Sequence, residues 1–222
     1  MRENPLLNLL INIVIPVVIL TKFNNNNSFN PLGVFALALA FPLLYGLYDL
    51  AKKRKYNFFS LVGLISIFLT GGIGLLQLGS KWVAFKEAGV PFIVGLIILL
   101  SVKTKHPLIE KLIGQVVKMD LVYGTLKNKG NLILFKKKVR HYTYFIALSF
   151  FFSALLNYAL AKFILTSEPG TITFNQELGK MTALSFPIIA LPSTLILVII
   201  FYFLFRDIKK LTSLELEEII LR

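Results

Sequence analysis

Polar side chains recur at helical spacing inside several long apolar stretches of this 222-residue chain. They are Thr70 and Gln77 in the third stretch, Ser149, Ser153 and Asn157 in the fifth, and Ser185 in the sixth. Steps of three or four residues place such groups on one side of a helix. In a membrane they either hydrogen-bond across helix contacts or line a path for a polar substrate. Both readings stay open from the sequence.

Residues for other chemistries are absent or scattered. The chain has no cysteine, which excludes disulfides, thiolate metal sites and cysteine nucleophiles. His106 and His141 have no metal-ligand spacing around them. Neither a phosphate-binding glycine loop nor a nucleophilic serine elbow occurs in the sequence. We therefore expect no catalytic residue, no metal site, no cofactor and no enzymatic activity.

Charged residues near the apolar stretches are few. Asp49 closes the second stretch beside Lys52 and Lys53, so an ion pair at the depth of the lipid headgroups accounts for it. Lys86 and Lys180 each stand just before a stretch, at its outer end. No carboxylate lies near the middle of a stretch, where coupling to protons would need one.

The elements that position these groups are membrane helices. Apolar residues make up 56% of the chain, and the mean hydropathy is +0.74. A helix needs about 20 apolar residues to cross the hydrocarbon core. The sequence predicts an all-α, six-helix transmembrane bundle in a single domain, residues 1–222, with spans near 6–21, 31–50, 58–78, 88–102, 142–165 and 182–205.

The basic residues predict the orientation. Most of the 24 Lys and Arg residues fall in alternate loops. The exceptions are Lys22, Lys81, Lys86, Lys162 and Lys180. Positive charge collects on the cytoplasmic side, so both termini, the loop 103–141 and the tail 206–222 are expected there. The net charge of +13 has the same explanation, because basic residues that flank spans lie near anionic lipid headgroups. We therefore do not expect nucleic acid as a partner.

Two short amphipathic helices are expected outside the spans. Residues 107–117 start with Pro107 and place apolar side chains on one face, so this helix lies on the membrane surface or packs under the bundle. In the tail, Thr212 and Glu215 have the spacing of a capping box, which predicts a helix after them. That helix docks on its own chain or on a partner.

One segment resembles a known family. Trp82, Lys86 and a span with Gly95 are followed by Lys105-His106-Pro107-Leu108-Ile109-Glu110-Lys111-Leu112-Ile113-Gly114. This order is similar to the intracellular septation protein A (YciB) family of bacterial inner-membrane proteins, which carries a Lys-x-Pro-Leu-Ile-x-x-Leu-x-Gly segment after a descending span. The matching residues are Lys86, Lys105, Pro107, Leu108, Gly114 and, more weakly, Asn157. The segment after Gly114 and the acidic tail depart from the family pattern.

The resemblance implies a multi-pass protein of the bacterial cytoplasmic membrane that is linked to septation and the cell envelope and has no catalytic chemistry. Its partners would be anionic lipid headgroups and other envelope or division proteins. A second hypothesis is a small carrier, working as a homo-oligomer, that passes a polar solute or lipid headgroup along the polar faces of the third, fifth and sixth spans.

Overall fold

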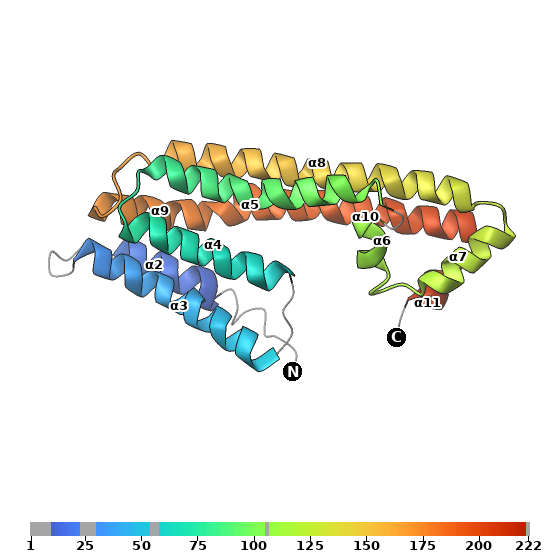
Figure 1. The fold of residues 1–222 in the computed structure, drawn as a ribbon, viewed down its shortest axis with the longest axis horizontal. Helices are drawn as coiled ribbons and strands as arrows, with labels where there is room; N and C mark the ends of the chain where they lie inside the picture. Colours follow the sequence, from blue (N-terminus) through green and yellow to red (C-terminus); the bar gives the residue numbers. More distant parts are fainter. Residues whose placement is uncertain (1–9, 23–29, 54–57, 105–106, 221–222) are drawn as a thin grey trace. The chain divides into compact units, whose positions relative to one another are not determined.

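The computed structural model describes residues 10–22, 30–53, 58–104 and 107–220, and they are almost entirely helical (Figure 1). The prediction of an all-α protein is confirmed for these residues, whose single extended contact is an isolated bridge between Val117 and Ile220. The helices are η1 (Leu10–Val14), α2 (Ile15–Lys22), α3 (Pro31–Lys53), α4 (Phe58–Leu75), α5 (Ser80–Ser101), α6 (Leu108–Ile113), α7 (Met119–Asn128), α8 (Leu132–Ile164), α9 (Ile172–Ser185), η3 (Phe186–Ala190), α10 (Leu191–Thr212) and α11 (Leu216–Ile219).

Within the described residues, four helical segments are long and apolar enough to cross a membrane. They are Pro31–Tyr48, Ser80–Ser101, Leu132–Ile164 and Ile172–Thr212, and a shorter apolar helix covers Leu10–Lys22. These segments fit a membrane protein, while the count of six spans stays a prediction. Many large apolar side chains on them are exposed, as lipid contact requires.

Several helices begin earlier than the apolar pattern indicates. The fifth predicted span starts near residue 142, but α8 starts at Leu132 and runs through Lys136, Lys137 and Lys138. Lysine is a good helix former although it is costly in hydrocarbon. Hydropathy therefore marks where a helix meets lipid, and it underestimates how far the helix extends.

The contacts within the chain divide it into two compact units. Unit 1 contains residues 1–90 and 154–190, and unit 2 contains residues 91–153 and 191–222. Of the three boundaries, one falls inside α5, one inside α8 and one between η3 and α10, so α5 and α8 contribute residues to each unit. The organisation of the whole chain as one domain stays a prediction.

In unit 1, α3 packs against both α2 and α4, and α2 also packs against α9 (Figure 1). Phe35 from α3 fills the centre, 2% exposed, beside Ala38 and Ile73. A Cβ on Gly74 would overlap the Phe35 ring, so α4 can approach α3 only with glycine at this position. Gly74 therefore serves helix packing.

In unit 2, the segment after α5 folds into a small cap, which we define as α6, α7 and α11. Ile109, Ile113 and Val117 are each 1% exposed, and they pack against the unit's own long helices. The helix expected over residues 107–117 is shorter, because α6 ends at Gly114. Membrane-surface binding by this helix stays a prediction.

The tail packs against its own chain. The Lys118 backbone amide donates a hydrogen bond to the Ile219 carbonyl at 2.7 Å, beside the bridge between Val117 and Ile220. The expected capping box is displaced along the sequence, since α10 continues through Thr212. Instead, the Glu215 amide donates to Glu218 Oε2 at 2.7 Å, which caps the start of α11.

Candidate functional site

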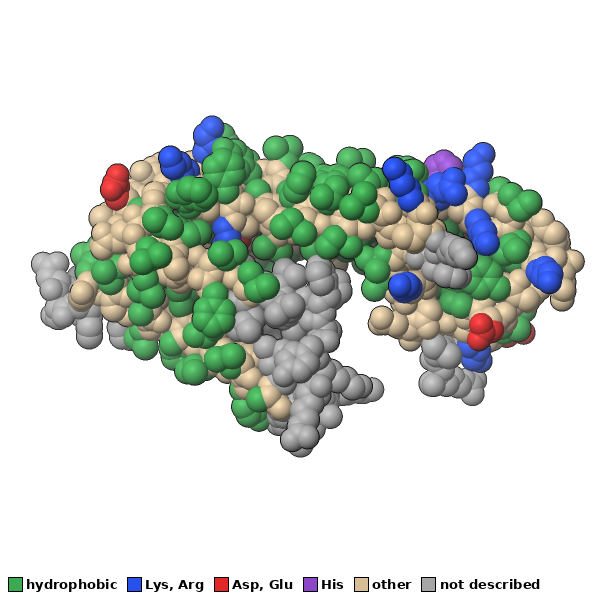
Figure 2. Space-filling model, in the orientation of Figure 1, with side chains coloured by type: hydrophobic (Ala, Val, Ile, Leu, Met, Phe, Trp, Pro, Cys, Tyr) green, Lys and Arg blue, Asp and Glu red, His purple; other side chains and the backbone are tan. Residues whose placement is uncertain are grey.

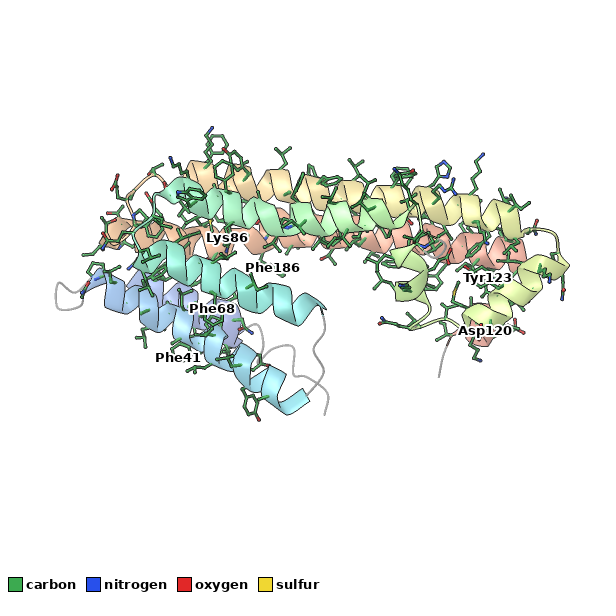
Figure 3. All side chains as sticks on the ribbon, in the orientation of Figure 1. Phe41, Phe68, Lys86, Asp120, Tyr123 and Phe186 are labelled. Atoms are coloured by element: carbon green, nitrogen blue, oxygen red, sulfur yellow. The ribbon has the colours of Figure 1, made fainter. Side chains whose placement is uncertain are left out.

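The most unusual polar group in unit 1 is the Lys86 ammonium on α5 (Figure 3). The Lys86 side chain is only 6% exposed. Its Nζ donates to Thr70 Oγ1 on α4 and to Glu87 Oε1, each at 2.6 Å. The Glu87 side chain is 26% exposed, so the carboxylate lies at the edge of the buried region.

This arrangement holds a charge inside an apolar helix. Residues i and i+1 do not face one another on a helix, so Lys86 and Glu87 meet only because both long side chains bend toward each other. A buried ammonium without partners would be very costly, and the pair with a carboxylate and a hydroxyl offsets that cost. An ionisable residue within a membrane helix is by default a functional candidate.

The sequence singled out both Lys86 and Thr70 but did not connect them. Lys86 was expected at the outer entrance of a span that started near residue 88, whereas α5 begins at Ser80 and holds Lys86 within the helix. The two residues belong to consecutive helices, and only the packing of α4 against α5 brings them together. One feature of the sequence could have indicated this contact: a lysine near a span is energetically costly without a counter-charge, so Lys86 required a partner.

Two of the predicted span hydroxyls are bonded within their own helices. Ser149, 6% exposed, donates to the Ile146 carbonyl at 2.8 Å, and Ser185 donates to the Met181 carbonyl at 2.8 Å. Such back-bonding satisfies a hydroxyl without any partner helix or water. Ser153 and Asn157 are half-buried on α8, and each has an interaction partner.

Gln77 lies outside the helix in which it was expected. α4 ends at Leu75, and Gln77 has a left-handed backbone with φ 52°. The Leu78 amide donates to the Ile73 carbonyl and the Gln77 amide to the Gly74 carbonyl, at 2.9 and 3.2 Å. This pair of bonds is a Schellman motif, so Gln77 ends the helix.

Four of the residues that carry the family resemblance lie at or next to α6 in the sequence, whereas Lys86 is on α5 and Asn157 on α8. Pro107 is its buried N-cap, and Gly114 is its C-cap. The Leu108 amide donates to Ser101 Oγ at 3.0 Å, which ties the start of α6 to the end of α5. Lys105 lies outside the described residues, and so does His106. Pro107, Leu108 and Gly114 thus all have roles in folding the cap.

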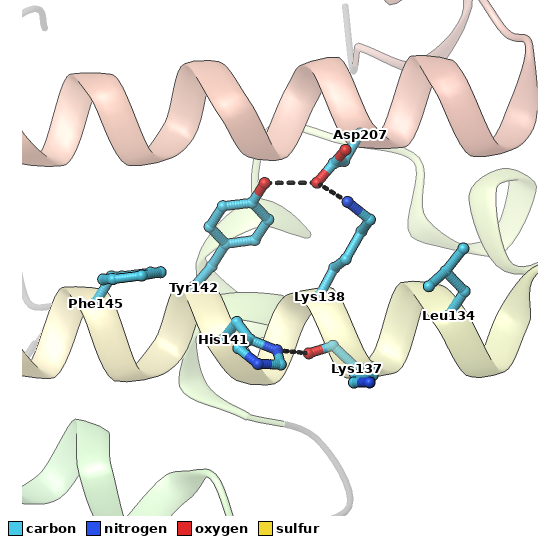
Figure 4. Close-up of a pocket in the computed structure, with 7 residues that line it drawn as sticks. All are labelled: Leu134, Lys137, Lys138, His141, Tyr142, Phe145 and Asp207. Carbon is cyan, nitrogen blue, oxygen red and sulfur yellow. Dashed lines mark hydrogen bonds and ion pairs between the residues drawn. The ribbon is translucent and has the colours of Figure 1, made fainter.

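A second polar cluster lies between α8 and α10 in unit 2 (Figure 4). Lys138 Nζ and the Tyr142 hydroxyl both donate to Asp207 Oδ2, at 2.8 and 2.5 Å. These groups line a cavity of about 330 Å³ together with Lys137 and His141. We call it the α8–α10 cavity. The sequence pattern predicts His141 in the loop 103–141 and Asp207 in the tail 206–222, and it does not pair them.

A buried carboxylate also occurs in the cap. Glu110 on α6 is 7% exposed and accepts a hydrogen bond from the Tyr123 hydroxyl on α7 at 2.6 Å. Burial raises the pKa of the Tyr123 phenol above its usual value, and the hydrogen bond to Glu110 raises it further. The pair therefore joins the first two helices of the cap.

The described residues contain no group of three or more His, Cys, Asp or Glu side chains arranged to hold a metal ion. A comparison of the chain with protein-family models, curated proteins and solved structures gives no match. The resemblance to the septation family therefore stays a prediction that depends on the residues around α6.

Proposed function

We propose that the chain is a non-enzymatic, multi-pass membrane protein that acts through contacts with lipid and with other membrane proteins. The resemblance to septation proteins favours the bacterial inner membrane and the cell envelope as its setting. Both termini and the cap would then face the cytoplasm, because most basic residues flank that side.

The observation that carries this proposal is the bonding of the span hydroxyls. Ser149 and Ser185 donate to carbonyls of their own helices, and Thr182 does the same toward Leu178 at 2.9 Å. Groups that line an aqueous path present their donors to the path instead. The lining of the α8–α10 cavity includes none of the predicted polar-face residues. A second cavity, lined by residues such as Val18 and Phe41, is apolar throughout.

Substitution of Ser153 and Asn157 by leucine tests the proposal in membranes. Both side chains are half-buried on α8, so Ser153→Leu and Asn157→Leu should overfill helix contacts and lower the thermal unfolding temperature. Phe152→Leu is the matched control, because Phe152 is 43% exposed and should leave stability unchanged. Leucine variants that stay as stable as the control would argue against packing as the role of this face.

A carrier of a polar solute or lipid headgroup is the second candidate, and the Lys86 site favours it. A buried ammonium next to Glu87 and Thr70 provides charge and hydrogen bonds inside an apolar helix. A carrier would lose flux in the Ser153→Leu and Asn157→Leu variants while they remain folded and inserted. Uptake into vesicles that contain the purified chain separates the two functions.

A further inference from the structure

The α8–α10 cavity combines cations with an apolar approach. Lys137 and Lys138 follow one another on α8, and His141 comes one turn later (Figure 4). Phe145 closes the lining on the side that leads into the apolar part of α8. In Figure 2, Lys and Arg side chains gather around the α6–α7 end of unit 2, whereas hydrophobic side chains cover its long helices.

The charges that line the cavity do not cancel. Asp207 is the only carboxylate in the lining, and Lys138 and the Tyr142 hydroxyl already occupy its Oδ2. The Lys137 ammonium has no bond or ion pair with any residue that the structure describes. One uncompensated cation therefore remains at the cavity, next to the imidazole of His141.

The tautomer of His141 adds a second polar atom. His141 Nδ1 lies 2.8 Å from the Lys137 carbonyl oxygen. A carbonyl can only accept, so Nδ1 carries the hydrogen. Nε2 only accepts in the neutral ring, and it donates to an anion when the ring is the doubly protonated imidazolium. The imidazole and the Lys137 ammonium come from successive turns of α8, and both side chains are exposed.

On the C-terminal side of Lys137 and His141, the same face of α8 is apolar and exposed. His141, Phe145, Leu148 and Phe152 follow one another at steps of four, three and four residues, which keeps them on one face. Phe145, Leu148 and Phe152 are 55%, 62% and 43% exposed. On α10, Phe203 and Ile199 precede Asp207 at four-residue steps and are 44% and 54% exposed.

The dimensions match one leaflet of a bilayer. From His141 to Phe152 an α-helix rises about 16 Å, at about 1.5 Å per residue. Half of the hydrocarbon core is about 15 Å thick. A lipid whose phosphate contacts Lys137 and His141 would therefore place its acyl chains against Phe145, Leu148 and Phe152.

We propose that the α8–α10 cavity is a binding site for the headgroup of an anionic phospholipid. The phosphate is held by the Lys137 ammonium and by Nε2–H of His141 in its imidazolium form, and the chains run along the apolar faces of α8 and α10. The Lys138–Asp207–Tyr142 cluster joins the two helices and forms the wall of the cavity. This site rests on the proposed function, because it specifies the lipid that the protein contacts.

Lipid binding to the full-length chain in neutral detergent micelles tests the site. Bound phosphatidylglycerol and phosphatidylcholine are counted by native mass spectrometry across a titration of each lipid. The expected result is preferential binding of phosphatidylglycerol. A basic residue near an anionic surface contributes enough for removal of Lys137 to weaken binding about fivefold. Lys137→Gln should give that loss, and Lys137→Gln with His141→Gln a larger one.

Two further variants make the test specific. Lys127→Gln with Lys129→Gln removes the same type of charge from the exposed end of α7, outside the lining of the cavity, and should leave binding unchanged. Asp207→Asn removes the one carboxylate and keeps an acceptor for Tyr142, so phosphatidylglycerol should bind more tightly. Circular dichroism and gel filtration establish that each variant is folded.

Equal binding of the two lipids would overturn the site, and so would equal losses in the α7 control and in the cavity variants. Displacement of phosphatidylglycerol by free glycerol phosphate would identify a site for a soluble phosphate instead. These results are independent of the proposed function, which depends on the stability of the Ser153→Leu and Asn157→Leu variants.

Discussion

At the scale of single residues, the buried Lys86 ammonium depends on its two bonding partners. It is 6% exposed, and its bonds reach Glu87 and Thr70 at 2.6 Å. Removing one member of a buried ion pair leaves the other charge uncompensated, whereas replacing both by apolar groups is often neutral. Replacing one residue of the Lys86–Glu87 pair should therefore lower stability more than replacing both.

We expect Glu87→Ala to destabilise the protein by about 1–3 kcal/mol, because the buried ammonium loses its counter-charge. The double variant Lys86→Met with Glu87→Ala should recover most of that loss, since neither charge remains. Thermal unfolding of the purified protein in detergent measures both. A double variant that is less stable than Glu87→Ala would contradict this interpretation of the pair.

The cap offers a residue-scale prediction with a pH dependence. Because burial and the bond to Glu110 raise the pKa of Tyr123, the folded state favours the neutral phenol. Its contribution to stability is fully present below pH of about 10, the pKa of an unfolded tyrosine, and is lost as pH rises through the higher folded pKa.

Stability measured between pH 8 and 11 should therefore fall less steeply in Tyr123→Phe than in the parent protein. At neutral pH the same variant should be less stable by about 1–3 kcal/mol, because Glu110 loses its donor. Tyr144→Phe is the control, since Tyr144 is 48% exposed on α8. Parallel pH profiles for the parent and Tyr123→Phe would show that the phenol does not carry this dependence.

At the scale of helices, close approach is controlled by single glycines. On α4, Gly72 and Gly74 are two residues apart, but only a Cβ on Gly74 would overlap the buried Phe35 ring. On α5, a Cβ on Gly95 would lie 3.0 Å from the Phe151 ring of α8. The helix contacts in each unit thus depend on where the backbone has no side chain.

Gly74→Ala should destabilise the protein by about 1–3 kcal/mol, because the ring of Phe35 cannot move without displacing its neighbours. Gly72→Ala is the matched change, and it should be neutral or stabilising by up to about 1 kcal/mol, since alanine is the better helix former and the Cβ meets open space. The ranking of the two unfolding temperatures checks the packing. Equal effects would show that α3 and α4 are not in close contact at Gly74.

Sequence patterns predicted the helical class and the apolar segments because hydropathy and helical period are local properties. The same patterns missed two contacts between residues distant in sequence and the end of one helix. Lys86 meets Thr70 only through the packing of α4 on α5, and Asp207 meets Lys138 only through that of α10 on α8. The end of α4 at Gln77 was missed because a left-handed glutamine gives no compositional signal.

At the scale of the whole molecule, the features that the sequence and structure support are those of a membrane-embedded protein with a small helical cap on unit 2. Long helices expose apolar side chains, while Ser149 and Ser185 donate to carbonyls of their own helices. The buried Ser193 hydroxyl on α10 has no hydrogen-bond partner among the described residues. The proposed function requires that the polar positions of the spans lie in helix contacts, away from water.

The most direct test of that claim is the hydration of the polar positions, and the chain suits it because it has no native cysteine. Single cysteines at Thr70, Ser149, Ser153, Asn157 and Ser185 are treated with a polar, membrane-impermeant thiol reagent in sealed and in opened vesicles. Lys129→Cys, at an exposed position outside the apolar helices, is the positive control. We expect labelling at Lys129→Cys alone, as buried helix contacts require. Labelling at the span positions would reveal a water-filled path and would contradict a protein that acts through contacts.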